Sequence, residues 1–290
     1  MQQIDGYTRL CGLIGNPIEH TLSPIIHNTL AKQEDRNLVY VPFRVAAGKV
    51  KNAVEGAYAL NFLGLNVTVP YKSEVINSLK EMDEMAEKIG AVNTLVRTEG
   101  GFKGYNTDMM GLYRAMNSEN IRVEGEEIII LGAGGGARAV AFLCAAKGAK
   151  KVYMMNRTYA KVRYVAEEVN DSFGRECIIP MQLKDYKKIS KKKKYLAIQA
   201  TSVGLYPNVE DVVIDEEDFY SLIHTGVDLV YKPSETRFMS LVKAAGGETY
   251  NGLKMLLYQG IIAYELWNDI QVTEESAVEI FELMRQALGQ

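Results

Sequence analysis

"IIILGAGGGARA", residues 128–139, places an isoleucine-rich run, a glycine turn and an alanine-rich stretch in direct succession. Gly132, Gly134 and Ala137 form a G-x-G-x-x-A pattern. In such a turn the first glycine permits the sharp bend, the second lets backbone amides approach a pyrophosphate, and the small third residue lets helix and strand pack closely. The helix start favours the anion through its free N–H groups. A strand pattern precedes these glycines and a helical pattern follows, so we expect dinucleotide binding rather than a purely structural turn.

The next predicted strand, residues 151–155, ends in "NRT". An NAD site commonly carries an acidic residue at this distance, which bonds the ribose 2′-hydroxyl. This chain has Asn156, Arg157 and Thr158 there, with Lys161 one helical turn further on. Arginine can form two bonds to a 2′-phosphate and lysine adds a point charge, whereas a carboxylate would repel it. The pattern therefore favours NADP(H), with a plain surface arginine as the alternative.

Apolar runs and helical patterns alternate along the rest of the chain. Further strands are predicted at residues 9–15, 39–45, 62–70, 91–106 (with a hairpin turn), 195–202 and 225–231. Further helices are predicted at residues 23–34, 48–60, 72–90, 107–120 and, in two pieces, 253–288. The alternation indicates an α/β protein, and 290 residues favour two domains over one.

Composition excludes several functional classes. A formal net charge of −3 gives no reason to expect nucleic acid or an anionic membrane as a partner, and the lysine run at residues 191–194 is interpreted as a solvated loop. Three widely separated cysteines without a C-x-x-C spacing predict no metal site and no disulfide framework. The most apolar segment, residues 255–267, is too short and too polar to span a bilayer, and no signal-like start is present. We expect a soluble cytoplasmic protein.

Three polar features within the first 108 residues are candidates for a functional role. Residues 15–24, "GNPIEHTLSP", gather hydroxyls in one tight loop, where Ser23 is predicted to cap a helix that has Pro24 at its first position. Lys72 follows an apolar strand pattern, and Asp108 opens a predicted helix. Alone they are an ordinary surface lysine and an ordinary helix-start acid. Together they form a candidate proton-transfer pair beside a hydroxyl that is oxidised.

Nine motifs in order resemble the shikimate dehydrogenase family over nearly the whole chain. They are "GNPIEHTLSPIIHN", "NVTVPYK", "GAVNT", "NTD", "GAGGGARA", "NRT", "QATSVG", "DLVYKPSET" and "GLKMLLYQ". The family reduces 3-dehydroshikimate to shikimate with NADPH on the route to aromatic amino acids. Thr21, Tyr71 and Gln199 stand where the family commonly has serine, phenylalanine and asparagine.

The resemblance implies roles for individual residues. Lys72 would be the acid/base group and Asp108 its partner. The substrate would be bound by Thr21 and Ser23 at its carboxylate, by Thr68, Asn93 and Gln259 at its hydroxyls, and by Tyr231 in the pocket wall. The cofactor would be contacted by Gly132, Ala133, Gly134, Gly135, Gly136, Asn156, Arg157, Thr158, Lys161, Thr201, Leu229 and Gly252.

The resemblance also implies the domain plan. Residues 1–107 with 252–290 would form an α/β substrate-binding and catalytic domain, to which the C-terminal helices return, and residues 108–251 a Rossmann-type NADP-binding domain. Shikimate and 3-dehydroshikimate would be the small-molecule partners, and both a monomer and a homodimer are compatible with the sequence. Two alternative functions are a quinate/shikimate dehydrogenase that uses NAD and a non-catalytic NADP-binding sensor. Arg157 counts against the first, and the presence of both Lys72 and Asp108 counts against the second.

Overall fold

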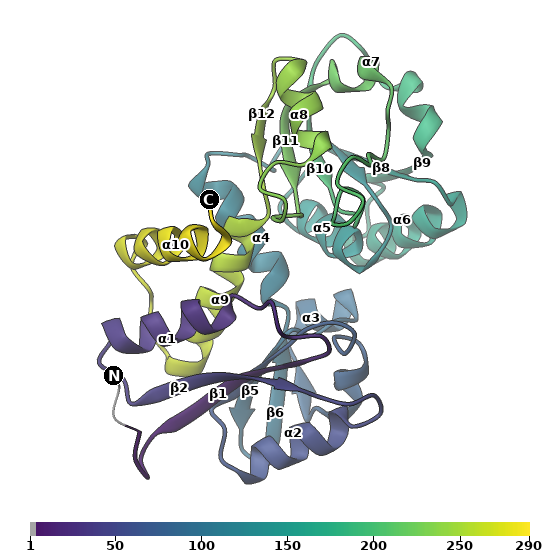
Figure 1. Ribbon diagram of the computed structural model, residues 1–290. Coiled ribbons are helices and arrows are strands. Elements are labelled where there is room, and N and C mark those ends of the chain that lie inside the picture. The colour runs from purple at the N-terminus through teal and green to yellow at the C-terminus, as the bar shows by residue number, and fades with distance from the viewer. Residues whose placement is uncertain (1–3) are drawn as a thin grey trace. The chain divides into compact units, whose positions relative to one another are not determined.

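The computed structural model describes residues 4–290, and the chain forms two compact units (Figure 1). The first unit contains the residues up to Gly111 together with Leu256–Gln290, and the second contains Leu112–Met255. Residues 1–3 of the predicted first domain lie outside the described part.

The first unit is built on a six-stranded sheet of order β2-β1-β3-β5-β6-β4. β1 pairs in parallel with β2 and β3, whereas β5 and β6 form the predicted antiparallel hairpin and β5 runs antiparallel to β3. The strands are β1 Arg9–Gly15, β2 Leu38–Arg44, β3 Gly64–Val67, β4 Glu81–Met82, β5 Thr94–Thr98 and β6 Gly101–Tyr105. The helices are α1 Ser23–Gln33, α2 Val50–Ala59, α3 Glu84–Ile89, α9 Leu253–Asn268 and α10 Glu274–Leu288, and α4 Thr107–Ser118 begins in this unit.

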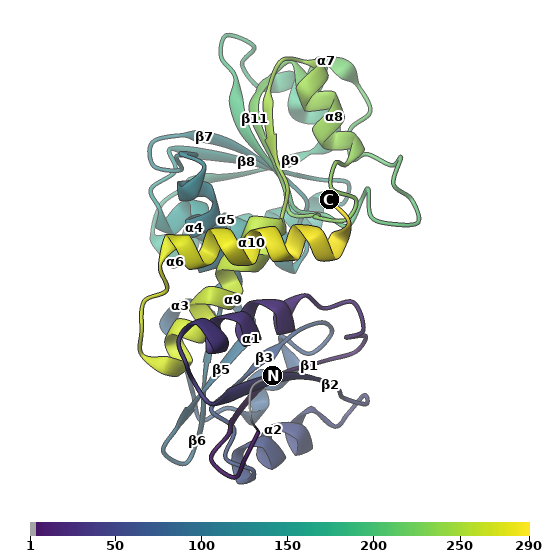
Figure 2. The ribbon, with the colours of Figure 1, turned by 60° about the vertical axis from the view of Figure 1, so that its left-hand side comes forward.

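Helices cover both faces of this sheet, with α1 and α9 on one face and α2 on the other (Figures 1 and 2). Side chains alternate along β3: Leu65 and Val67 pack into the core under α2, while Asn66 points to the opposite face. On that opposite face Trp267 of α9 donates from its indole nitrogen to the carbonyl of Leu95, at 2.9 Å. The C-terminal helices therefore complete the core of the first unit, as predicted.

The single helix predicted over residues 72–90 is wrong. The segment forms a short 3-10 helix, Glu74–Ser78, then β4, then α3. Backbone amides of Lys80 and Asp83 donate to the carbonyls of Phe102 and Gly104 on β6, so the middle of the segment extends the sheet. The Asp83 carboxylate accepts the Met85 amide as the N-cap of α3, which explains why a new helix begins there.

The second unit is a parallel sheet of order β12-β11-β10-β7-β8-β9. Its strands are β7 Glu127–Leu131, β8 Lys151–Asn156, β9 Ile178–Gln182, β10 Tyr195–Gln199, β11 Ile223–Asp228 and β12 Glu248–Tyr250. The helices α5 Gly135–Ala146 and α6 Tyr159–Phe173 cover one face, and α7 Glu217–Tyr220 and α8 Arg237–Ala244 the other (Figures 1 and 2). The chain order reverses between β10 and β7, which is the point where doubly wound sheets bind their ligands.

A buried histidine lies inside the first unit. His27 on α1 is fully buried and stacks on Tyr40 with ring centroids 4.1 Å apart, near Trp267 at 5.0 Å. Neither ring nitrogen makes a hydrogen bond of normal geometry. Burial lowers the pKa of His27 to about 3, and the neighbouring Asn66 amide opposes this shift only in part.

We expect this histidine to make the protein less stable in mild acid. Its folded-state pKa lies below the unfolded value of about 6.5, so the unfolded chain binds the proton first and stability falls as pH drops below 6.5. At pH 5 the loss is about 2 kcal/mol, because one unit of pH corresponds to about 1.4 kcal/mol per proton. Urea unfolding of wild type and His27→Leu at pH 7 and pH 5 measures it. The variant should lack this part of the pH dependence, and an identical pH dependence in both proteins would contradict the assignment.

Candidate active site

Lys72 and Asp108 form an ion pair between the loop after β3 and the first turn of α4. Lys72 Nζ donates to Asp108 Oδ2 at 2.6 Å, and the two side chains remain 32% and 20% exposed. The pair is therefore shielded from bulk water but still open to a small molecule. The arrangement can hold an ammonium or amine at a fixed point and exchange a proton there with a bound oxygen.

Local contacts fix the backbone that carries the lysine. The Val92 amide donates to the Lys72 carbonyl at 2.8 Å. The buried Tyr71 ring places its hydroxyl 2.8 Å from the carbonyl oxygen of Val45, to which it donates. A phenylalanine at position 71 could not make this bond, and the Val45 carbonyl would lose its donor. This explains why a tyrosine stands here.

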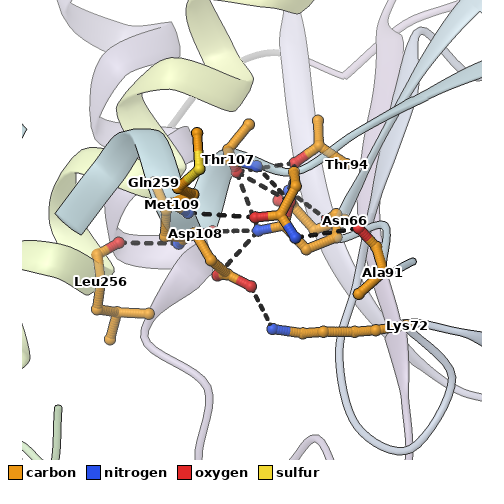
Figure 3. A network of polar contacts seen from close by, with 11 residues as sticks. Asn66, Lys72, Ala91, Thr94, Thr107, Asp108, Met109, Leu256 and Gln259 are labelled. Atoms are coloured by element: carbon orange, nitrogen blue, oxygen red, sulfur yellow. Dashed lines mark hydrogen bonds and ion pairs between the residues drawn. The ribbon is translucent and has the colours of Figure 1, made fainter. Parts of the chain in front are cut away.

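The Asn93 side chain connects Asp108 to Thr107 and Gln259. Figure 3 shows these three partners together with Lys72. The Thr107 amide lies 2.7 Å from one end of the Asn93 carboxamide, and a backbone N–H can only donate, so that end is the oxygen. The NH₂ end therefore faces Asp108 Oδ1 at 3.0 Å and Gln259 Oε1 at 3.4 Å. Asn93 is 2% exposed, so its orientation is set by protein partners.

Gln259 reaches the same point from α9. Its Nε2 donates to the Leu256 carbonyl at 2.8 Å, which turns Oε1 towards Asn93. A Cβ added to Gly111 of α4 would lie 2.5 Å from the Gln259 backbone nitrogen. Only glycine at position 111 allows the two helices to approach this closely.

The hydroxyl loop lies at the end of β1. Thr21 Oγ1 accepts the Ser23 amide at 3.2 Å and donates to Ser23 Oγ at 3.1 Å. The prediction that Ser23 caps α1 is wrong: Leu22 is the N-cap, its side chain makes no capping bond, and Ser23 is the first helical residue. The Thr21 hydroxyl accepts the Ser23 amide instead, and the buried Ser23 hydroxyl interacts with Thr21 and Tyr40.

Thr68 lies against the start of this loop. Its amide donates to the Ile14 carbonyl at 2.9 Å, and a Cβ on Gly15 would lie 2.3 Å from Thr68 Cγ2. The structure thus brings Thr68 to the segment that leads to Thr21 and Ser23. Direct contacts join Lys72, Asp108, Asn93 and Gln259 in a second group.

The predicted cofactor residues gather at the carboxyl edge of the second sheet. Gly132 has φ of +122°, and a Cβ there would lie 2.9 Å from the Ala200 carbonyl oxygen and from Thr201 Cγ2. Gly134 is the N-cap of α5, without a side-chain cap, and a Cβ on Gly134 or Gly135 would meet nothing within 4 Å. The space on the side-chain side of these two glycines is therefore open.

The neighbouring strand ends complete this edge. A Cβ on Gly136 would lie 3.7 Å from Leu229 Cδ1, and one on Gly252 would lie 2.1 Å from the Leu229 carbonyl oxygen. Arg157 and Lys161 are exposed after β8. Asn156 donates to the Thr158 carbonyl at 3.1 Å, and Thr158 is the N-cap of α6. Ala133, between Gly132 and Gly134, is half-buried.

Tyr231 also belongs to the second unit, two residues beyond Leu229. Its side chain is half-buried, and burial raises the pKa of its phenol.

Comparison with known proteins places these features in a family. The profile of the "Shikimate dehydrogenase substrate binding domain" matches residues 13–95, and that of "Shikimate / quinate 5-dehydrogenase" matches residues 115–204. The shikimate dehydrogenase (NADP(+)) of Desulforamulus reducens is 41% identical over 269 residues, which cover 91% of each chain. The chain belongs to the shikimate dehydrogenase family.

Solved structures of shikimate dehydrogenases have the same fold. Shikimate 5-dehydrogenase of Listeria monocytogenes, in complex with shikimate and NAD, aligns with a TM-score of 0.88 at 32% identity, over 97% of this chain and 98% of that one. The Thermus thermophilus enzyme, in complex with NADP(H) and shikimate, aligns with a TM-score of 0.81 at 30% identity, over 95% and 99%. The α/β class with a Rossmann-type domain is therefore confirmed.

Four polar residues behind the candidate site were not predicted from the sequence: Tyr40, Asn66, Thr94 and Thr107. Tyr40 donates to Asn66 Oδ1 at 2.8 Å, and Asn66 Nδ2 donates to Thr94 Oγ1 at 3.0 Å. Thr94 Oγ1 lies 3.0 Å from Thr107 Oγ1. All four are buried. A polar residue on an otherwise apolar strand, such as Asn66 between Leu65 and Val67, is the signal that identifies such a network.

Within residues 4–290, none of the helices combines the length and apolar character needed to cross a membrane. The same range contains no group of three or more histidine, cysteine or acidic side chains placed to hold a metal ion.

Proposed function

We propose that the protein is an NADP-dependent shikimate dehydrogenase, which reversibly reduces 3-dehydroshikimate to shikimate in the pathway to chorismate and the aromatic amino acids. The observation that carries this proposal is the Lys72–Asp108 pair, with 2.6 Å between Nζ and Oδ2. The pair lies beside the side-chain amides of Asn93 and Gln259, in a chain of the matching family.

We assign residues 1–107 with 252–290 to substrate binding and catalysis, and residues 108–251 to NADP(H) binding. The first assignment is supported by Lys72, Asn93 and Gln259, which lie in the first unit. Their partner Asp108 lies in the same unit, because that unit extends to Gly111. The second is supported by the glycine turn at the reversal point of the parallel sheet.

The lysine acts on the oxygen of the reacting carbonyl. During reduction Lys72 Nζ delivers a proton to this oxygen as it becomes a hydroxyl, and during oxidation the same atom accepts the proton. Asp108 fixes Nζ through the 2.6 Å bond and offers Oδ1 or Oδ2 to a neighbouring substrate hydroxyl. NADPH, when bound, supplies the hydride.

The remaining polar groups orient the ring. Thr21 and Ser23 bind the substrate carboxylate through their hydroxyls, and Thr68, Asn93 and Gln259 bind the ring hydroxyls. The Asn93–Gln259 contact, at 3.4 Å, is the longest that the Asn93 amide makes, so a substrate hydroxyl can replace it at the smallest cost. Tyr231 contributes to the wall of the pocket.

The second unit fits a dinucleotide. The amides of Gly134, Gly135 and Gly136 at the start of α5 receive the pyrophosphate, because the space beside Gly134 and Gly135 is open and a helix start attracts anions. Arg157 and Lys161 hold the 2′-phosphate. The remaining contacts are made by Gly132, Ala133, Asn156, Thr158, Thr201, Leu229 and Gly252.

We expect Arg157→Ala to weaken use of NADP far more than use of NAD. Arg157 is exposed and follows β8 without an acidic neighbour, so its guanidinium can bond a 2′-phosphate that only NADP carries. Charge-assisted bonds contribute about 1.5–3 kcal/mol each, so the KM for NADP should rise roughly 10- to 100-fold. Steady-state kinetics with both cofactors measures this, with Arg163→Ala on the exposed face of α6 as control. Equal increases in KM for the two cofactors would show that Arg157 does not recognise the phosphate.

A direct assay tests the proposed function. Purified protein is mixed with 3-dehydroshikimate and NADPH, the loss of NADPH absorbance is followed, and the product is identified by proton NMR. We expect shikimate as the product and net reversal when shikimate and NADP⁺ are supplied. Binding of NADPH without turnover of either acid would support the non-catalytic sensor instead.

A further inference from the structure

We propose that the hydroxyls of Thr94 and Thr107 are positioning groups, which lock the Asn93 amide so that its hydrogens point at Asp108. Both threonines are fully buried. The bonds of their hydroxyls go to Asn66, Asn93 and each other, so we infer that the hydroxyls act on the proton-transfer pair through Asn93. This role rests on the proposed function of Asp108 and Asn93.

Three donor groups surround the oxygen of the Asn93 side-chain amide. The Thr107 amide donates to Oδ1 at 2.7 Å, and the hydroxyls of Thr94 and Thr107 each lie 3.2 Å from the same atom. Asn66 Nδ2 donates to Thr94 Oγ1, and Asn93 Nδ2 donates to Thr107 Oγ1, at 3.0 Å each. Each hydroxyl therefore accepts one bond from an amide and has one hydrogen left to donate.

Two arrangements of these hydrogens satisfy every atom. Either Thr94 donates to Thr107 across 3.0 Å and Thr107 donates to Asn93 Oδ1, or Thr107 donates to Thr94 and Thr94 donates to Asn93 Oδ1. Exactly one hydroxyl hydrogen reaches Asn93 Oδ1 in both cases. The pair thus holds the Asn93 oxygen whichever arrangement is present.

Of the two threonines, only Thr107 contacts the NH₂ end of Asn93. One Asn93 hydrogen bonds Thr107 Oγ1 at 3.0 Å, which leaves the other for Asp108 Oδ1 at 3.0 Å. Without the Thr107 oxygen the remaining acceptor for this first hydrogen would be Gln259 Oε1, at 3.4 Å, and the amide would rotate towards it. Rotation would weaken the bond that fixes Asp108 opposite Lys72.

The threonines lie on rigid elements, which suits a positioning role. Thr94 begins β5, and Thr107 begins α4, one residue before Asp108. Because both side chains are inaccessible to water, no solvent molecule can take over a lost bond without local rearrangement. Valine has the shape of threonine without the hydroxyl, so Thr→Val removes the bonds and preserves β-branching.

The kinetic test uses Thr94→Val and Thr107→Val, their serine counterparts, and Thr98→Val as the matched control. Thr98 lies on β5 as well, but its hydroxyl donates to the Gly101 carbonyl of the hairpin rather than to Asn93. We expect each valine variant to lower kcat/KM for shikimate about tenfold, the cost of leaving one buried polar atom unsatisfied, with an unchanged KM for NADP. Serine should recover most of the loss, and Thr98→Val should have no effect.

A double-mutant cycle separates positioning from simple loss of stability. In an Asn93→Ala background, Thr107→Val should cost almost nothing further in kcat, because its route to Asp108 is already absent. The same tenfold loss in that background would overturn the inference.

A spectroscopic readout works whether or not the protein turns over shikimate. The Asn93 side-chain amide signals, assigned by their absence in Asn93→Ala, should exchange with water faster in Thr107→Val than in wild type or Thr98→Val. Unchanged signals overturn the inference even if wild type is active. Changed signals in a protein that turns over neither acid support the locked amide and reject the proposed function.

Discussion

Lys72→Ala is expected to lower kcat for shikimate oxidation by about 10²–10⁴-fold, the usual contribution of a general acid/base group. The substitution removes Nζ, which donates to Asp108 Oδ2 at 2.6 Å and remains accessible to a ligand. The KM for shikimate should change little, since Asn93, Gln259 and Thr68 remain. Steady-state kinetics over a range of shikimate concentrations, together with the melting temperature, measures the effect.

Lys88→Ala is the matched control. Lys88 pairs with Glu84 at 2.7 Å on α3, and its side chain is 33% exposed, against 32% for Lys72. Such pairs contribute about 0–1 kcal/mol to stability, so this variant should keep wild-type turnover. Near-wild-type kcat in Lys72→Ala would show that the chemistry takes place elsewhere.

Asp108→Asn is expected to be nearly as damaging, with a loss of about 10²-fold or more in kcat. Each oxygen of the Asp108 carboxylate accepts a hydrogen bond: Oδ2 accepts from Lys72 Nζ, and Oδ1 accepts from Asn93 Nδ2. An asparagine has only one oxygen, so its NH₂ group would face either the ammonium or the Asn93 amide. The substitution therefore sets donor against donor and displaces the lysine.

The double variant tests whether the two residues act as one unit. The kcat of the double variant, Lys72→Ala with Asp108→Asn, should lie within a few fold of the kcat of the slower single variant. Neither residue has its function without the other. Asp218→Asn serves as control, since its carboxylate also accepts from two side chains, Tyr186 and Lys191, in the second unit. Losses that multiply would mean that Lys72 and Asp108 contribute independently.

The strands β7, β8, β10 and β11 and the helix α5 of the cofactor unit were predicted from local sequence. The turn at residues 128–139 forms as expected and requires Gly132, because its φ is +122° and a Cβ there would lie 2.9 Å from the Ala200 carbonyl oxygen. The helices α6, α7 and α8 and the strands β9 and β12 were not predicted. The buried residues of α6 and α8 recur at helical spacing, so the sequence does carry a signal for these two helices. The short strands β9 and β12 are stabilised by pairing with β8 and β11, which local patterns do not reveal.

The segment at residues 72–90 shows where periodicity fails. Its apolar spacing suits a helix, yet sheet pairing with β6 and the cap at Asp83 divide it into three elements. Tertiary pairing overrides a local preference when the segment lies beside an open sheet edge.

The candidate site was likewise predicted only in part from the sequence. Motif resemblance supplied Lys72, Asp108, Asn93 and Gln259, and the structure places these four in contact. The supporting hydroxyls and amides were not predicted, because their partners lie 13 to 28 residues apart in the chain. Only the folded sheet brings them together.

One set of rates tests the proposed function most directly: kcat/KM for shikimate and for quinate, each with NADP and with NAD. We predict the highest value for shikimate with NADP, at least tenfold above the other three combinations. Quinate carries an extra hydroxyl on the carbon that bears its carboxylate, and the Thr21 methyl group cannot bond it, so an unpaired buried group would cost about 1–3 kcal/mol. A higher value for quinate, or for NAD, would contradict the assignment of Thr21 and Arg157 and favour a quinate/shikimate dehydrogenase.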